Sequence, residues 1–403
     1  MTKYLLLLTF ACAVCLTACD DKTETIKEIT VSVQITTPDS VTTVPESYQV
    51  EFINYNDNSK VEKTAGADGK VTASILPGVY TISVSAEALE QGFSTIYSGS
   101  LVNENIVTDG ASYTIEVKVA KSGTLVFKEI YYAGSKTPSN ASYFRDQFFE
   151  IYNNSESVVY ADGLCVGTLY TNLASATQPT WDKENAADYV YYQWLWQIPG
   201  TGTQYPIQPG EAIIVAQWAT NHQVEALNPN APVNLSSSEF EGYIAASSTQ
   251  IQTDEQAINL NLIYRMSSFQ SMPQWLNSVN GCAYALFFPD GKTDITELTT
   301  QEGSTAQGVA IPISLILDAV ETVKDETQVQ LKRIPTVLDA GATFVSATYN
   351  SKSVARKIKE TKDGRNIYQD TNNSTNDFEV QDTPTIRRNG AKKPSWNTWS
   401  NGN

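Results

Sequence analysis

The sequence has little of the chemistry on which most catalytic sites depend. Its 403 residues include a single histidine, His222, and five cysteines, three of which lie within the first 19 residues. A histidine-based catalytic triad and a multi-ligand zinc site are therefore not predicted. Basic residues are also scarce, because 27 Lys and Arg stand against 44 Asp and Glu and give a net charge of −17. A chain this acidic repels phosphate backbones, so we expect no nucleic-acid partner.

Residues 1–18 have the pattern of a secretory signal peptide. One lysine precedes an apolar run that is too short to span a membrane as a helix. The run ends in Leu16-Thr17-Ala18-Cys19, which resembles the lipobox of bacterial lipoproteins and implies acylation of Cys19, for example with palmitate; an ordinary cleaved signal is the alternative. The acidic residues after Cys19 resemble the surface-export signal of Bacteroides-type lipoproteins. We expect a tether at 19–28 and an outer-membrane anchor that faces the cell surface, with the periplasmic face as alternative.

Besides the acylated Cys19, the mature chain keeps two cysteines, Cys165 and Cys282. The expected compartment is oxidising, which would permit a disulfide between them. They lie far apart in the sequence and show no framework spacing, so we favour two separate buried thiols over the disulfide.

Residues 29–120 predict a first β-sandwich. Apolar and polar residues alternate in "ITVSVQIT", "SYQVEFIN" and "YTIEVKVA", as expected for strands with one buried face. Asp68-Gly69 predicts a tight hairpin turn, because glycine accepts the positive φ that such turns need. The order of aspartate-glycine, strand, Leu76-Pro77-Gly78, Tyr80 and strand resembles the carboxypeptidase-regulatory or transthyretin-like sandwich. That resemblance implies an accessory module without an active site.

Residues 123–380 predict a second sandwich. The segments "LVFKEIYYAG", "DQFFEIYNNSESVVYADGLCVG", "YPIQPGEAIIVA" and "DTNNSTNDF" resemble the lamin-tail domain, which is immunoglobulin-like, with long insertions at 165–205 and 218–280. The overall order resembles a Bacteroides-type lipoprotein family known as domain of unknown function 4876, which implies no particular activity. Helical spacing predicts an amphipathic helix at 312–323, and residues 381–403 predict a polar, basic tail. We therefore expect a mainly β chain with two antiparallel sandwiches and one or two short helices.

Glu150, in "FFEIYNN", is the carboxylate most in need of an explanation. Alternation places Phe149 and Ile151 on one face of the strand, and Phe148, Glu150 and Tyr152 on the other. Since an isolated carboxylate on a sheet seldom acts in catalysis, we expect a structural role, with Lys128, Arg145 or a turn amide as its partner.

The insertion at 181–206 concentrates aromatic residues and is the predicted ligand-binding region. Flat rings near carboxylates suit stacking on a sugar or an aromatic ligand. A strand buried on both faces is the structural alternative. Alternation places Tyr192, Trp194 and Trp196 on one face of this segment, with Tyr191 and Leu195 on the other. The candidate ligand-binding residues are Trp181, Tyr192, Trp194, Trp196 and Trp275.

The segment "DTNNSTND" is the candidate metal site. Asp370, Asn372 and Ser374 have the one-three-five spacing of a calcium-binding loop, and Asp377 adds a carboxylate. The glycine and the final glutamate of an EF-hand are missing, so turns closed by Asn and Asp side chains are the alternative. We expect no cofactor, with calcium at this loop as the open exception.

These observations favour a non-enzymatic outer-membrane lipoprotein that acts in surface binding or as the accessory partner of an outer-membrane uptake or assembly complex. The membrane contact would be made through Cys19, and the expected partners are an outer-membrane transporter or a surface glycan. The alternatives are a carboxylate-dependent glycan hydrolase and a purely architectural cell-surface protein.

Overall fold

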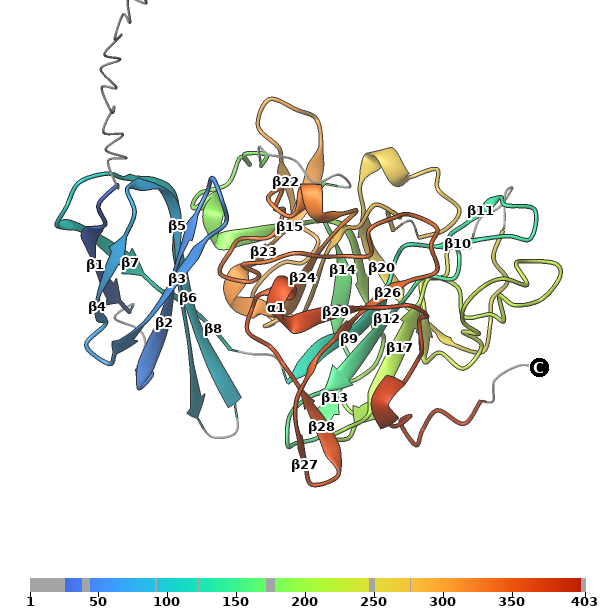
Figure 1. Ribbon diagram of the computed structural model, residues 1–403. Coiled ribbons are helices and arrows are strands. Elements are labelled where there is room, and N and C mark those ends of the chain that lie inside the picture. The colour runs from blue at the N-terminus through green and yellow to red at the C-terminus, as the bar shows by residue number, and fades with distance from the viewer. Residues whose placement is uncertain are drawn as a thin grey trace, which may run out of the picture.

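The computed structural model describes residues 26–37, 44–90, 93–121, 124–171, 178–245, 251–275 and 277–399. Two β-sandwiches follow one another along the chain, the N-terminal one on the left of Figure 1 and the larger C-terminal one beside it. The predicted mainly β fold with antiparallel sandwiches is therefore confirmed. No helix in the described part of the chain is long and apolar enough to span a membrane.

The N-terminal sandwich packs a three-stranded sheet, order β4-β1-β7, on a five-stranded sheet, order β3-β2-β5-β6-β8. Val31, Phe52 and Ile82 lie in its core, as the alternation of their strands predicts. Gly69 has a φ of +66° in the turn between β3 and β4, so the predicted tight turn is confirmed. The predicted hairpin is wrong, because the chain crosses from one sheet to the other at this turn: β3 pairs with β2, whereas β4 pairs with β1. The strands are β1 (Ile29–Thr36), β2 (Ser47–Asn54), β3 (Lys60–Gly66), β4 (Lys70–Ile75), β5 (Gly78–Glu90), β6 (Phe93–Ile106), β7 (Ala111–Glu116) and β8 (Lys118–Lys121).

The C-terminal sandwich contains a seven-stranded sheet with the order β19-β18-β17-β12-β9-β26-β29. Its second sheet has eight strands: seven follow the order β22-β23-β15-β14-β21-β24-β25, and β20 also pairs with β15. The first sheet is formed by β9 (Leu125–Tyr131), β12 (Phe148–Asn153), β17 (Ala212–Ala216), β18 (Phe240–Glu241), β19 (Ile258–Asn259), β26 (Ser353–Arg356) and β29 (Phe378–Gln381). The second is formed by β14 (Cys165–Leu169), β15 (Tyr189–Gln197), β20 (Asn261–Arg265), β21 (Ala283–Phe287), β22 (Leu298–Thr300), β23 (Gln307–Pro312), β24 (Ile316–Val323) and β25 (Thr343–Phe344).

Short elements complete the C-terminal sandwich. Three two-stranded ribbons pair β10 (Ser135–Lys136) with β11 (Ser142–Tyr143), β13 (Val159–Tyr160) with β16 (Pro206–Ile207), and β27 (Ile358–Lys362) with β28 (Arg365–Tyr368). The helices are α1 (Ser374–Asp377) and the 3-10 turns η1 (Ala186–Asp188), η2 (Ser267–Phe269), η3 (Ile313–Leu315), η4 (Glu326–Gln328) and η5 (Arg388–Gly390).

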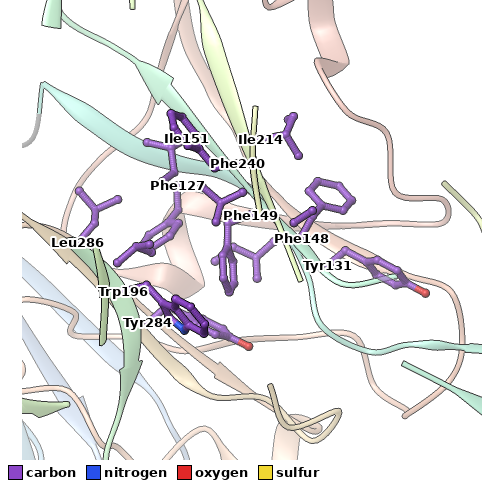
Figure 2. Close-up of a cluster of buried hydrophobic side chains, with 14 of the residues drawn as sticks. Phe127, Tyr131, Phe148, Phe149, Ile151, Trp196, Ile214, Phe240, Tyr284 and Leu286 are labelled. Carbon is purple, nitrogen blue, oxygen red and sulfur yellow. The ribbon is translucent and has the colours of Figure 1, made fainter. Parts of the chain in front are cut away.

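Aromatic side chains fill the space between the two large sheets. Phe149 of β12 lies with its ring centroid 4.8 Å from that of Tyr284 and 5.4 Å from that of Trp275, so it joins the facing layers (Figure 2). On the opposite face of β12, Phe148 contacts Tyr131. The alternation predicted for 148–152 is therefore confirmed.

The helix predicted at 312–323 is wrong. The segment forms η3 and then β24, which pairs with β21. Seven of the eight residues of β24 are buried, because both faces of this strand are covered. A strand that is buried on both faces does not show the alternation of apolar and polar residues that identifies a strand. Chance helical spacing among its apolar residues then led to the wrong prediction of a helix.

Cys165 and Cys282 are separate buried thiols, so the favoured interpretation is confirmed and the alternative disulfide does not form. Strands β14 and β21 are neighbours, but Cys165 pairs in register with Phe287, at the far end of β21 from Cys282. The two thiols also belong to different apolar clusters.

Residues 382–399, expected to be part of a polar tail, cover the outer face of the seven-stranded sheet. Arg388 forms an ion pair with Glu129 of β9 at 3.0 Å, and the indole nitrogen of Trp396 donates to the carbonyl of Pro206. A β-bulge in the β9–β12 pairing makes this possible, since it directs Lys128 and Glu129 to the same face. The basic residues of this segment therefore neutralise carboxylates on the sheet.

Candidate functional site

A pocket of about 690 Å³ lies beside the first half of β15 and has one aromatic wall. That wall consists of Tyr170, Trp181, Tyr189 and Tyr191, and residues 332–336 form the opposite side. Tyr170 and Tyr189 are half-buried, whereas Trp181 and Tyr191 lie deeper at 5% and 8% exposure. The half-buried rings of Tyr170 and Tyr189 are therefore the accessible ones, and they pack against the buried rings of Trp181 and Tyr191.

Trp181 is the centre of this aromatic wall. Its ring stacks on Tyr191 with centroids 4.1 Å apart and planes 3° from parallel, and Tyr170 meets it edge-on at 5.3 Å. Backbone pairing with Gln301 holds the residue against the end of β22. Gly308 of β23 leaves room for the indole, because a Cβ at that position would lie 3.0 Å from the ring.

Polar groups lie at the rim of the pocket. Lys183 places its ammonium 4.6 Å from the centroid of the Tyr189 ring, and Glu302 is the one acidic residue among the described residues that line the pocket. Burial raises the pKa of Tyr191 to about 12, so its hydroxyl stays neutral and donates to the carbonyl of Ala186 at 3.0 Å. This arrangement can stack on a flat apolar face and form hydrogen bonds with the edge of that face. The described residues of the lining include no pair of carboxylates of the kind that acid–base hydrolysis uses.

Four of the five predicted ligand-binding residues do not line this pocket. Trp194, Trp196 and Trp275 are fully buried between the large sheets, and Tyr192 is fully buried on the other side of the eight-stranded sheet. The prediction of an exposed stacking surface formed by these residues is therefore wrong. Of these five residues, Trp181 lines this pocket.

A β-bulge explains why the predicted face of β15 was also wrong. Along the β14 pairing, Trp194 lies opposite Thr168 and Tyr192 lies opposite Leu169, so Gln193 is an extra residue. One inserted residue reverses the alternation beyond it. Tyr192 consequently faces away from Trp194 and Trp196, although simple alternation places all three together.

The predicted calcium loop is organised by an arginine. Arg356 of β26 reaches Asp370 at 3.1 Å and Asp377 at 3.6 Å, and it also pairs with Asp318 of β24 at 2.7 Å. In addition, the carboxylate of Asp377 accepts from the backbone and hydroxyl of Thr371. The guanidinium therefore occupies the position of the expected cation.

The remaining residues of this loop also have protein partners. The hydroxyl of Ser374 donates to the buried carboxylate of Asp339 at 2.5 Å, and the side-chain amide of Asn372 donates to the carbonyl of Val337. No group of three metal-ligating residues exists within the described ranges. The alternative interpretation, in which Asx turns close this loop, agrees with the structure.

Glu150 has the structural role that the sequence predicts. Its carboxylate lies 3.0 Å from the ammonium of Lys128 and accepts from the backbone of Arg387 at 3.0 Å. Burial raises the pKa of Glu150, and Lys128 partly offsets this effect. The side chain is fully buried, so it is not presented to a substrate.

His222 is also a structural residue. Its ring nitrogens contact the hydroxyl of Tyr143 at 2.7 Å and the carbonyl of Trp218 at 2.9 Å. Burial lowers the pKa of His222 to about 4, which keeps the imidazole neutral.

A solved structure resembles this chain over nearly all of its length. It is the crystal structure of a DUF4876 family protein from Bacteroides thetaiotaomicron, which is 38% identical in sequence, with a TM-score of 0.64. The match covers 91% of this chain and 99% of that one. This chain belongs to the DUF4876 family. The family model itself, described as a protein of unknown function, matches residues 208–385.

Two further solved structures are similar to this DUF4876 protein at much lower identity. A candidate adhesin from Bacteroides ovatus is 10% identical, with 71% of this chain and 85% of that chain covered and a TM-score of 0.21. A DUF3823 family protein from Parabacteroides merdae is 10% identical, with 73% and 100% covered and a TM-score of 0.17. No curated protein matches the chain.

The pocket of this DUF4876 protein could be predicted only in part. The aromatic content of 181–206 directs attention to Trp181, and Tyr189 and Tyr191 belong to the same segment. Residues 332–336 carry no signal of their own, because they are joined to the aromatic wall only by the fold. Cys19, the predicted lipid-attachment residue, lies outside the described residues.

Proposed function

We propose that this DUF4876 protein is a non-enzymatic lipoprotein of the outer-membrane surface that binds neutral glycans in its aromatic pocket. The observation that carries this proposal is the wall formed by Tyr170, Trp181, Tyr189 and Tyr191. A sugar ring has an apolar C–H face and a hydroxylated edge, and the pocket offers rings beside Lys183 and Glu302. The lipobox-like sequence that ends at Cys19 supports the anchor.

Glycan binding suits an accessory partner of an outer-membrane uptake or assembly complex, since an anchored pocket would concentrate a glycan beside its transporter. Hydrolysis is less well supported than binding, because the described residues that line the pocket include one carboxylate, Glu302. A purely architectural role is the second candidate. The burial of Trp194, Trp196 and Trp275, which the sequence offered as ligand-binding rings, favours it.

A glycan microarray followed by isothermal titration calorimetry tests the binding proposal. Tyr189→Ala should weaken the best neutral oligosaccharide by about tenfold, because the loss of one stacking ring removes roughly 1–1.5 kcal/mol. Tyr55→Ala is the matched control, since Tyr55 is 65% exposed and lies on the N-terminal sandwich. If no neutral glycan binds, or if both variants bind like the natural chain, the architectural candidate prevails.

The anchor is tested separately in cells. Labelled palmitate should attach to the natural chain and not to Cys19→Ser, and protease added to intact cells should degrade a surface-facing protein. Labelling of neither chain would refute the anchor, whereas protection from protease would favour the periplasmic face.

A further inference from the structure

A second cavity, of about 490 Å³, lies between the two sandwiches. On the N-terminal side it is lined by the outer face of β2, β5 and β6, and on the C-terminal side by residues 336–340 and 369–376 together with Lys357. The sandwiches touch beside it through hydroxyl groups. Ser98 donates to the carbonyl of Val337 at 2.8 Å, and the hydroxyls of Ser100 and Thr336 are 2.9 Å apart. We call this cavity the interdomain cleft.

The N-terminal wall of the interdomain cleft is made of short polar side chains. Phe52 and Ile82 face the core of the sandwich, and the residues that alternate with core positions, among them Gln49, Ser83 and Ser85, line the cleft. Serine has neither the β-branch nor the ring that stabilises a sheet surface through cross-strand packing. Such a wall adds little to sheet stability, but it leaves space and offers hydroxyl groups.

The opposite wall is amide-rich and held in place before any ligand arrives. The side chain of Asn373 accepts from the backbone of Thr375 and Asn376, and Asp377 accepts from the backbone and hydroxyl of Thr371. The amide of Gln369 donates to the carbonyl of Asn376 at 3.2 Å. A wall fixed during folding loses little entropy when it binds a ligand.

The chemistry of the interdomain cleft matches a neutral, hydroxyl-rich ligand. The described part of the lining contains three charged residues, Glu51, Glu62 and Lys357. Glu51 lies 3.5 Å from the ammonium of Lys60, Lys357 donates to the carbonyl of Asn376 at 2.7 Å, and Glu62 is exposed. Hydroxyls and amides provide most of the other polar groups in the lining, and the described residues that form it include no aromatic ring. The cleft is therefore suited to hydrogen bonding to sugar hydroxyls, whereas the aromatic pocket is suited to stacking.

Thr336 joins the two sites, because it lines both the interdomain cleft and the aromatic pocket. We infer that the interdomain cleft is a second subsite, which takes further units of a neutral glycan chain whose end unit stacks in the aromatic pocket. This inference rests on the proposed function. It identifies the ligand as an oligosaccharide and assigns a binding role to the N-terminal sandwich.

Calorimetry on the full chain with ladders of neutral oligosaccharides tests the inference. The ligands are three series of neutral oligosaccharides built from α-1,4-linked glucose, mannose or xylose, each from the monosaccharide to the hexasaccharide. Each series is titrated into the natural chain, Ser85→Trp and Ser112→Trp. Ser85 is exposed and lines the cleft, and Ser112 is exposed on β7, in the other sheet of the same sandwich. Affinity for the bound ladder should rise with length by about tenfold, the value of a few net hydrogen bonds.

Ser85→Trp should abolish this rise and leave the shortest bound ligand unaffected, whereas Ser112→Trp should preserve it. Asn376→Ala, on the opposite wall, should reduce the rise without filling the cleft, and unfolding temperatures verify that each variant is folded. If Ser85→Trp keeps the full length dependence, the second subsite is refuted and the aromatic pocket stands. If no ladder binds the natural chain, the proposed function fails and the second subsite fails with it.

Discussion

Arg356→Met should destabilise the C-terminal sandwich by about 3–5 kcal/mol, the usual cost of removing one partner from a buried ion pair. The Arg356 side chain is 1% exposed and pairs with Asp318 at 2.7 Å and Asp370 at 3.1 Å. It also donates to the carbonyls of Phe127 and Gln369, both at 2.9 Å. Methionine has similar length without these donors, so it leaves buried carboxylates unpaired. The unfolding temperature should fall by roughly 6–20 °C.

The same substitution should show a defined pH dependence. Burial raises the pKa of Asp318 to about 7, although Arg356 opposes that rise. Without Arg356 the pKa of Asp318 should rise further. A carboxyl whose folded pKa is raised binds more protons in the folded state, and it therefore gains stability as the pH falls through that pKa. The stability lost in Arg356→Met should be largest at alkaline pH and should shrink as the pH falls toward 7.

Thermal unfolding followed by near-UV circular dichroism measures both effects. Lys352→Met is the matched control, because Lys352 forms an ion pair of 2.7 Å with Asp382 at the surface and should lose at most about 1 kcal/mol. Adding Asp318→Asn to Arg356→Met should recover part of the loss. If Arg356→Met unfolds at the temperature of Lys352→Met at every pH, the role assigned to Arg356 is refuted.

Three further outcomes are expected. Arg388→Met leaves the buried carboxylate of Glu129 without its ion pair and should lower the free energy of unfolding by about 1–3 kcal/mol, as measured by denaturant titration. Lys393→Met, at an exposed position of the same segment, is the control and should change the free energy of unfolding by less than about 0.5 kcal/mol. The two cysteines of the mature chain should react with a maleimide only after unfolding, as measured by mass spectrometry, and labelling of the folded protein would contradict their burial. Folding lowers the pKa of His222 from 6.5 to about 4, so the neutral imidazole stabilises the folded state fully above pH 6.5 and this stabilisation is lost toward pH 4. Over this range the free energy of unfolding of the natural chain should fall by about 3 kcal/mol relative to that of His222→Gln. Parallel stability curves of these two chains would show that His222 does not titrate in this way.

Local patterns predicted the strands of this protein better than they predicted its site. Alternation in 148–152 correctly assigned the faces of Phe149 and Glu150, because both faces of that strand differ in chemistry. Residues 316–323 were misassigned, because burial on both faces removes the alternation. Along β15 side chains do alternate between the two faces, but the extra residue Gln193 reverses the order of the faces, and the sequence does not reveal this β-bulge.

The candidate site shows the same limit. Trp181 could be found from the aromatic content around it, but its partner Tyr191 was expected to face away from the stacking surface. The loop at 370–377, for which the sequence left calcium open, shows a different limit. A cluster of carboxylates can surround a metal ion or a cationic side chain. The sequence does not show that the cation beside Asp370 is the guanidinium of Arg356, which belongs to another strand.

By itself, the sequence determined that this chain forms β-sandwiches, that Asp68-Gly69 makes a tight turn and that a lone carboxylate such as Glu150 is structural. These properties depend on residues adjacent in the chain, whose alternation and turn chemistry act over short distances. Only the tertiary structure decided which rings border a pocket, which cation neutralises the loop at 370–377 and which cleft the two sandwiches enclose. Those outcomes depend on strand register and on contacts between distant segments, and a single bulge or one buried arginine is sufficient to change them.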